Sequence, residues 1–78
     1  MNNTWPFETF IEDIQNEGCA LLDIMKYNNS PYSTYNFLSL NGKTRVIILA
    51  DDEITTTTIQ EYLNQLELND LIDRKYHE

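Results

Sequence analysis

The amino-acid sequence predicts an α+β fold that consists of one helix, a three-stranded antiparallel sheet, a second helix and a short C-terminal helix. Apolar residues recur at helical spacing near the start of the chain and again after residue 58. Between these segments, apolar runs of strand length are separated by turn residues. The 78 residues contain no linker or internal repeat, so residues 1–78 are expected to form a single domain.

The first helix is expected over about residues 5–17. Phe10 and Ile14 lie four residues apart within an apolar stripe, and acidic residues fill the opposite face. Pro6 suits the first turn of a helix, where its missing N–H leaves no hydrogen bond unmade. Gly18 favours the left-handed conformation that commonly ends a helix.

A first strand is expected over residues 19–27, because apolar and mixed positions alternate there, a pattern that predicts one fully buried face. Cys19, the single cysteine, is expected to be a small buried apolar residue. Residues 28–31, Asn-Asn-Ser-Pro, then end the strand, since proline cannot donate to a sheet and asparagine accepts turn conformations.

A tight hairpin is predicted at Asn41-Gly42, between strands over residues 35–40 and 43–50. Both residues tolerate the positive φ that a two-residue type I′ turn requires. Residues 46–49 are apolar at every position, which is typical of a strand covered on both faces rather than of an exposed edge.

The second helix is expected to begin at Thr58, where the side chains of Thr58 and Glu61 can form a capping box. Apolar residues continue at helical spacing to Leu66. Asn69-Asp70 then interrupts the pattern, which favours a separate short helix at the end of the chain.

The charge of the chain restricts its classes of partner. Thirteen acidic and five basic side chains give a formal net charge of -8, which repels phosphate and opposes direct nucleic-acid binding. One cysteine and one histidine offer no zinc-binding cluster, so no metal or cofactor is expected. Neither a signal peptide nor an apolar run of membrane-spanning length is found, which predicts a soluble, cytoplasmic protein. A chain this short gains stability from a partner, so a homodimer is one expectation.

Two segments carry a resemblance to a known family. An amphipathic helix that ends in a small turn residue and runs into a strand occupies residues 10–21, and a Thr-capped helix occupies residues 58–66. Both patterns resemble the HicA/YcfA-like toxins, small double-stranded-RNA-binding-like ribonucleases that pair with HicB antitoxins. The resemblance extends over nearly the whole chain and implies the same scaffold.

The functional motif of that family is a Gly-Ser-His near the start of the second strand, in which the histidine is catalytic. The comparable stretch here is residues 32–37, so Thr34 or Tyr35 stands where the family has histidine. Neither hydroxyl can replace an imidazole as a general base, because its pKa lies far above neutrality. His77, next to the C-terminus, is expected to be a frayed surface residue. No catalytic residue is therefore assigned, and a divergent HicA-like toxin or ribonuclease is the alternative function.

The function that the sequence favours is protein binding, by a small acidic module that inhibits a nucleic-acid-handling protein. An acidic surface attracts a basic partner and can occupy its phosphate-binding groove. In composition the chain is similar to phage-encoded inhibitors of CRISPR or restriction machinery and to DNA mimics, which suggests a bacterial or phage-infected host cell. The carboxylates expected to bind the partner are Glu8, Glu12, Asp13, Glu17, Asp51, Asp52 and Glu53.

Other interpretations of these residues stay open. Excess acid can simply keep a small protein in solution. Asp51 and Asp52 could instead hold a metal ion for an enzyme, although no lysine accompanies them at motif spacing. Tyr32 and Tyr35, with Tyr27, gather near the Asn/Pro turn and are expected either to form an aromatic recognition patch or to pack beneath the loop.

Overall fold

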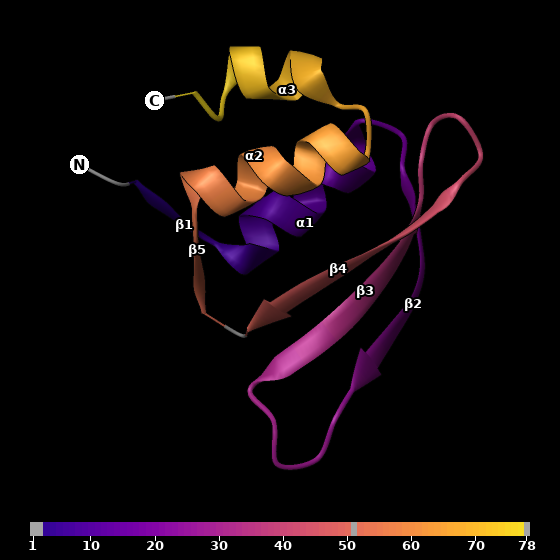
Figure 1. Ribbon diagram of the computed structural model, residues 1–78, viewed down its shortest axis with the longest axis vertical. Coiled ribbons are helices and arrows are strands. Elements are labelled where there is room, and N and C mark those ends of the chain that lie inside the picture. Colours follow the sequence, from indigo (N-terminus) through magenta and orange to yellow (C-terminus); the bar gives the residue numbers. More distant parts are fainter. Residues whose placement is uncertain (1–2, 51, 78) are drawn as a thin grey trace.

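The structure, a computed structural model that describes residues 3–50 and 52–77, places helices against one face of an antiparallel sheet (Figure 1). This arrangement confirms the predicted α+β class and the three-stranded sheet. The sequence does not predict the second, two-stranded sheet, which changes the order of elements. In chain order the elements are β1 (Thr4–Pro6), α1 (Phe7–Asn16), β2 (Ala20–Lys26), β3 (Tyr32–Leu38), β4 (Thr44–Ala50), β5 (Glu53–Thr55), α2 (Thr56–Gln65) and α3 (Asn69–Arg74).

The three-stranded sheet has the order β2-β3-β4, and its register defines two faces. Tyr35 pairs with Ile47 on the face that the helices cover, and Thr34 pairs with Ile48 on the opposite face. We call this opposite face the outer face. Its residues are Ala20, Asp23 and Met25 of β2, Tyr32, Thr34, Asn36 and Leu38 of β3, and Thr44, Val46, Ile48 and Ala50 of β4.

Strands β1 and β5 form an antiparallel ribbon that connects the start of the chain to the start of α2. Trp5 pairs with Ile54, and the Trp5 indole donates a hydrogen bond to the Thr56 hydroxyl (3.1 Å). The predicted helix start is therefore wrong: α1 begins at Phe7, and Pro6 precedes it in an extended conformation. Three-residue strands are too short to display the alternation by which longer strands are recognised.

The junction between α1 and β2 agrees with the prediction. The helix ends at Asn16, and Gly18 adopts a positive φ of 103°. Cys19 is buried, as predicted, and burial raises the pKa of its thiol. This cysteine therefore serves packing between the helix and the sheet.

The β3–β4 hairpin differs from the predicted two-residue turn. Ser39 N donates to Lys43 O (2.8 Å) and Gly42 N donates to Ser39 O (3.0 Å), so three residues form the loop. Gly42 has a positive φ of 83°, but Asn41 does not, which is typical of a type I turn followed by a left-handed glycine. The Asn41 side chain donates to Glu67 Oε2 (2.7 Å), and this long-range contact supports the longer loop.

The start of α2 lies earlier than predicted. Its N-cap is Thr55, whose hydroxyl accepts a hydrogen bond from Thr58 N (3.3 Å), so the predicted capping box of Thr58 and Glu61 is wrong. Any of the four consecutive threonines could cap a helix. Thr56 is buried and its hydroxyl donates to Asn3 O, and this tertiary contact places Thr55 at the cap position. The separate last helix, α3, is confirmed; Glu67 adopts a positive φ of 62° between α2 and α3.

The two edge strands of the sheet, β2 and β4, are more exposed than the sequence predicts. Only Leu21 of β2 is partly buried, so the fully buried face predicted for this strand is wrong. Strand β4 is an edge strand, and Val46 and Ile48 are 53% and 52% exposed. The predicted covering of both β4 faces is therefore also wrong for the isolated chain, because a chain of this length supplies helices to one face alone. The Tyr62 hydroxyl protects the β4 edge by accepting from Ile48 N (3.3 Å) and donating to Ile48 O (3.1 Å).

The core lies between the helices and the covered face of the sheet. Helix α3 packs on the far side of α2 from the sheet (Figure 1) and adds Leu71 to the core, followed by Tyr76. The Tyr76 ring meets Trp5 edge-on, with centroids 4.9 Å apart. The buried cluster consists of Phe10, Ile14, Cys19, Tyr35, Phe37, Ile47, Leu49, Ile54, Ile59, Leu63, Leu66, Leu68, Leu71 and Tyr76.

Candidate protein-interaction surface

Charge is distributed unevenly over this fold. Residues 20–50, which form the three-stranded sheet and its turns, contain three basic side chains and a single acidic one, Asp23. The rest of the chain contains twelve acidic side chains and two basic ones, Arg74 and Lys75. The helices and the β1–β5 ribbon therefore carry the negative charge of the protein, and the sheet does not.

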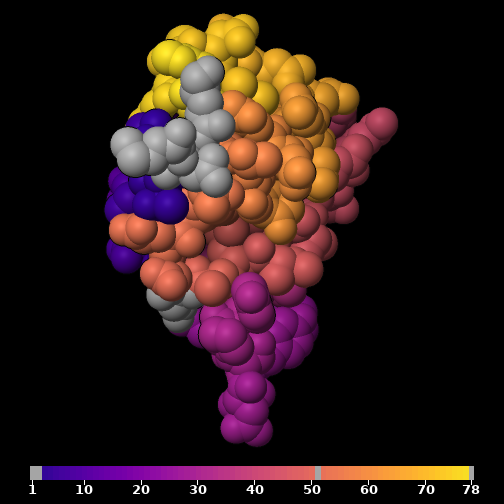
Figure 2. All heavy atoms as spheres, turned by 60° about the vertical axis from the view of Figure 1, so that its left-hand side comes forward, coloured from indigo at the N-terminus to yellow at the C-terminus, as the bar shows by residue number. Residues whose placement is uncertain are grey.

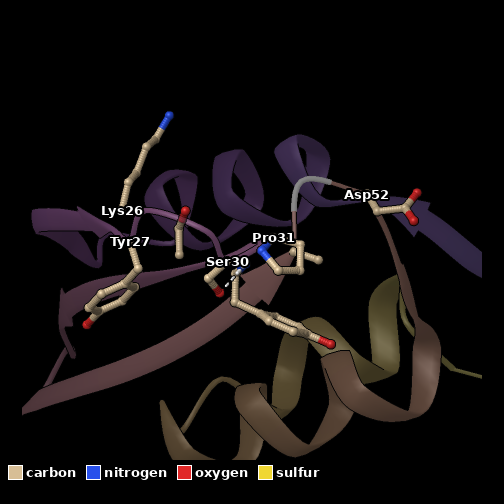
Figure 3. A pocket seen from close by; sticks show the side chains of 8 residues that line it. Lys26, Tyr27, Ser30, Pro31 and Asp52 are labelled. Atoms are coloured by element: carbon tan, nitrogen blue, oxygen red, sulfur yellow. Dashed lines mark hydrogen bonds between the residues drawn. The ribbon is translucent and has the colours of Figure 1, made fainter.

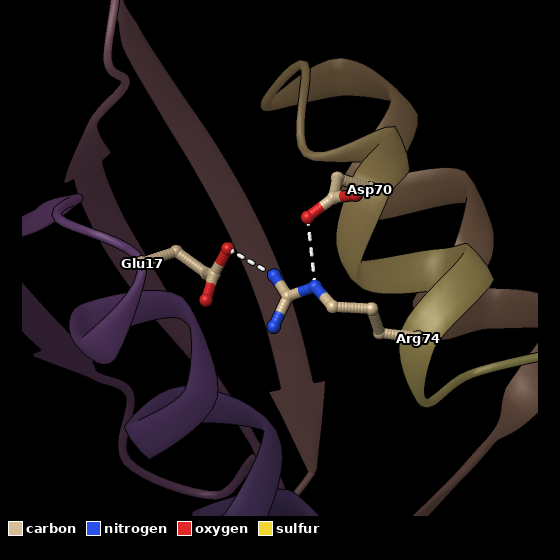
Figure 4. A network of polar contacts seen from close by, with 3 residues as sticks. All are labelled: Glu17, Asp70 and Arg74. Atoms are coloured by element: carbon tan, nitrogen blue, oxygen red, sulfur yellow. Dashed lines mark hydrogen bonds and ion pairs between the residues drawn. The ribbon is translucent and has the colours of Figure 1, made fainter.

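Arg74 and Lys75 compensate part of this charge near the C-terminus. The Arg74 guanidinium lies between Glu17 and Asp70, with N–O distances of 2.6 Å and 2.7 Å (Figure 4). Lys75 Nζ lies 2.7 Å from Asp13 Oδ2. Asp13 and Glu17, both predicted to bind a partner, thus connect α1 to the C-terminal segment. The i,i+4 spacing of Asp70 and Arg74 indicates one of these pairs, whereas the other two depend on tertiary contacts.

Asp13 has a second tertiary partner, Tyr76. The Tyr76 hydroxyl donates a hydrogen bond to Asp13 Oδ2, while its ring is buried against Phe10 and Trp5. Burial raises the pKa of Tyr76 well above its ordinary value, and the hydrogen bond and the negative charge of Asp13 raise it further. Asp13 therefore has a structural role, because it holds the C-terminal segment against α1 through Lys75 and Tyr76.

Glu8 and Glu12 lie one turn apart on α1, and both are exposed. Within residues 3–50 and 52–77, neither forms an ion pair. Glu8 also lies in the first turn of the helix, where a carboxylate is favoured by the helix dipole. Among the described residues, these two are therefore the predicted site residues on α1 that have no ion-pair partner.

Asp52 and Glu53 lie next to the first turn of α1, because Phe7 N donates to Asp52 O (3.2 Å). Asp52 Oδ1 accepts from Glu53 N (2.7 Å), and Glu53 Oε2 accepts from Thr4 Oγ1 (2.6 Å). These neutral donors orient the carboxylates without removing their charge. We call the set Glu8, Glu12, Asp52 and Glu53 the acidic end; Asp51, also predicted to belong to the site, lies outside the described residues.

Tyr32 lines an open pocket of about 330 Å³ beside the acidic end, and shares it with Lys26, Tyr27, Pro31 and Asp52 (Figure 3). The β2–β3 turn that forms part of this pocket projects from the body of the protein (Figure 2). An exposed aromatic ring therefore lies in the same pocket as one carboxylate of the acidic end.

Tyr35 lies in the core and is 4% exposed, which corrects the expectation that it belongs to a surface patch. Thr34, its neighbour, points to the outer face, since successive residues of a strand alternate between faces. The resemblance to the HicA-like toxins would align one of these two positions with a catalytic histidine, and the two lie on opposite sides of β3. His77 is exposed near the C-terminus.

Residues 3–50 and 52–77 contain no group of three or more His, Cys, Asp or Glu side chains arranged to hold a metal ion. None of the helices in those ranges has the length and apolar character that a membrane crossing requires. Comparisons with protein-family models, curated proteins and solved structures give no match for this chain.

Proposed function

We propose that this protein is an acidic protein-binding module that inhibits a nucleic-acid-handling protein by occupying its phosphate-binding surface. The supporting observation is the acidic end. Its carboxylates are exposed: Asp52 and Glu53 lie beside the first turn of α1, which carries Glu8, and Glu12 follows one turn later. Both basic side chains of the helical side are instead paired near the C-terminus. Such a surface repels phosphate but attracts the basic residues that bind phosphate. The expected setting is the cytoplasm of a bacterium or a phage-infected cell.

The two kinds of side chain at this surface have separate effects on binding. Exposed carboxylates accelerate association with a basic protein, and salt weakens their effect because exposed charges are screened. Tyr32 supplies an aromatic contact, and aromatic residues are frequent at the energetically important centres of interfaces. We therefore propose Glu8, Glu12, Asp52, Glu53 and Tyr32 as the contact residues, with Asp51 as a further candidate.

Competition with nucleic acid tests the proposal. Proteins from a lysate of the host are bound to DNA-cellulose or RNA-agarose, and purified protein is added to displace them. We expect it to elute a basic nucleic-acid-binding protein. The E8Q/E12Q/E53Q variant should elute that protein about tenfold less efficiently or worse, because three attractive charges are removed.

The matched control is D23N/E61Q/D73N, which removes three negative charges elsewhere on the surface. It should elute the same protein as the unmodified chain does. Equal losses in both variants would mean that net charge alone produces the competition. Elution of nothing by the unmodified chain would contradict the proposed inhibition.

A divergent HicA-like ribonuclease ranks second. The order α1-β2-β3-β4-α2 agrees with the scaffold that the resemblance implies, which is the observation in its favour. Tyr35 is buried and Thr34 lies between Met25 and Ile48 on the outer face, and both facts support the lower rank. Degradation of single- or double-stranded RNA that a T34A variant lacks would place this function first.

A further inference from the structure

We propose that two copies of this chain form a dimer in which the outer faces of their sheets pack against each other. The starting observation is a mismatch between the pattern of β4 and its surroundings. Residues 46–49 are apolar throughout, as in strands that are buried on both faces, yet Val46 and Ile48 are half exposed. Within one chain, nothing among the described residues covers the outer face of β4, although the apolar sequence of this strand is typical of a buried one.

The large exposed apolar residues of the outer face come from all three strands: Met25 of β2, Tyr32 of β3, and Val46 and Ile48 of β4. Register places Met25, Thr34 and Ile48 in one row across the three strands, and Val46 follows in the next row. Met25 and Tyr32 are 54% and 53% exposed, similar to the β4 residues. Exposed apolar residues scattered singly are ordinary, whereas Val46 and Ile48 are neighbours on the same face of β4, and neighbouring exposed apolar residues indicate an interaction surface.

Charge indicates that the occupant is a second copy. The outer face carries one charged side chain, Asp23, and the acidic side chains of the helices lie on the other side of the sheet. Two chains with a net charge of -8 repel each other in most orientations. Packing the outer faces together keeps the two helical layers apart, separated by both sheets, and joins the surfaces with the fewest charges.

The geometry of this contact is that of a sandwich. Two antiparallel sheets pack face to face about 10 Å apart, and a two-fold axis makes the same patch serve both copies. The central strand, β3, then faces β3 of the second copy. The dimer would present one acidic end on each side, and Tyr32 is the residue that the outer face shares with the proposed target contact.

Asn36 lies at the centre of this face, between Asp23 of β2 and Val46 of β4. Its Oδ1 atom is shielded from solvent and has no hydrogen-bond donor among the described residues. Asn36 and Thr34 therefore make the centre of the outer face polar, and the apolar side chains lie around them.

The mass of the purified protein in solution tests the dimer without any target protein. Light scattering coupled to size-exclusion chromatography should give twice the chain mass of 9.2 kDa at low and at high salt, since apolar contacts persist when charges are screened. The V46T/I48T variant keeps β-branched side chains at both positions and should raise the dimer dissociation constant about tenfold or more.

L40T is the matched control, because Leu40 is 61% exposed but lies in the hairpin loop, outside the outer face. It should leave the dimer unchanged. A T34C variant should form a cross-linked dimer with a short thiol reagent, whereas the unmodified chain, whose Cys19 is buried, should not.

Three outcomes would overturn the proposal. One is a monomer at high protein concentration. Another is a dimer that V46T/I48T does not weaken and T34C does not cross-link, since such a dimer would use another surface, such as the open β2 edge. The third is assembly that grows beyond two chains and dissolves in salt, which would indicate head-to-tail contact between the sheet and an acidic helical layer.

Discussion

At the residue scale, neighbouring acidic residues of α1 have different roles. Glu12 is exposed and carries an uncompensated charge, whereas Asp13 bonds Lys75 and Tyr76. Helical periodicity places both on the polar side of α1, since neither belongs to the apolar stripe. Which of the two meets another part of the chain depends on where the C-terminal segment packs. The acidic end is smaller than the predicted set of carboxylates for this reason.

The contact between Tyr76 and Asp13 predicts the effect of a conservative substitution. Tyr76→Phe keeps the buried ring but removes the hydroxyl that bonds the carboxylate. We expect the free energy of unfolding to fall by about 1–3 kcal/mol, because a hydrogen bond to a charged group contributes about that much. Urea denaturation at neutral pH measures the change. Tyr27→Phe, at an exposed tyrosine, is the control and should change stability by less than about 0.5 kcal/mol.

Tyr76 also predicts a loss of stability in alkali. Its pKa in the folded chain lies above the ordinary value of 10.0, so the native state keeps the proton after the unfolded chain has released it. The stabilisation is complete below that ordinary value and falls as the pH rises above it. Urea denaturation midpoints are measured at a pH well below and at a pH well above the ordinary tyrosine value of 10.0. From the lower to the higher pH, the midpoint should fall further for the unmodified chain than for Tyr76→Phe. Equal decreases would contradict the assignment.

At the scale of elements, α3 illustrates which contacts attach a short helix. Six residues are too few for an independent helix, so its formation depends on packing. Leu71 is buried in the core, whereas the Arg74 side chain is 51% exposed in its ion pairs. Exposed ion pairs contribute little because water screens them. The apolar contact is therefore expected to dominate.

Two substitutions in α3 compare these contributions. Leu71→Ala should lower the free energy of unfolding by about 2–4 kcal/mol, as removal of a buried leucine side chain does. Arg74→Ala should lower it by less than about 1 kcal/mol. Urea denaturation of both variants, with circular dichroism as the signal, measures the difference. A larger effect of Arg74→Ala would show that the ion pairs attach the helix.

At the scale of the whole molecule, the fold separates charge from exposed apolar surface. The acidic side chains belong to the helices and the β1–β5 ribbon, and the exposed apolar residues of β3 and β4 belong to the outer face. A back-to-back dimer makes use of both properties, since it buries the apolar face and leaves the acidic ends free. The proposed inhibition uses the acidic end and the proposed dimer uses the outer face, and Tyr32, at the border between them, belongs to both surfaces.

The dimer predicts that stability depends on protein concentration. Association stabilises the folded state by mass action, so the thermal unfolding midpoint should rise as the protein is concentrated. The midpoint of V46T/I48T should rise much less, and that of L40T should rise as in the unmodified chain. A midpoint of the unmodified chain that is independent of concentration would argue against association of the folded protein.

Local patterns in the sequence determined the class of fold and the approximate position of its main elements. The apolar stripes of α1 and α2, the alternation before the first turn and the separate last helix are encoded within a few residues each. Gly18 and the burial of Cys19 were predictable for the same reason, because each depends on an intrinsic property of one residue. The excess of acid over base is likewise a property of composition.

Contacts between distant residues decided the rest. Trp5 and Thr56, far apart in sequence, meet in the structure, and their contact accompanies the β1–β5 ribbon and the choice of Thr55 as the cap of α2. The side chain of Asn41 in the hairpin loop bonds the distant Glu67, and the charges available at the site depend on where Arg74 and Lys75 pack. Local propensity cannot encode these outcomes, because several threonine caps or exposed carboxylates are equivalent until the chain folds and tertiary contacts distinguish them.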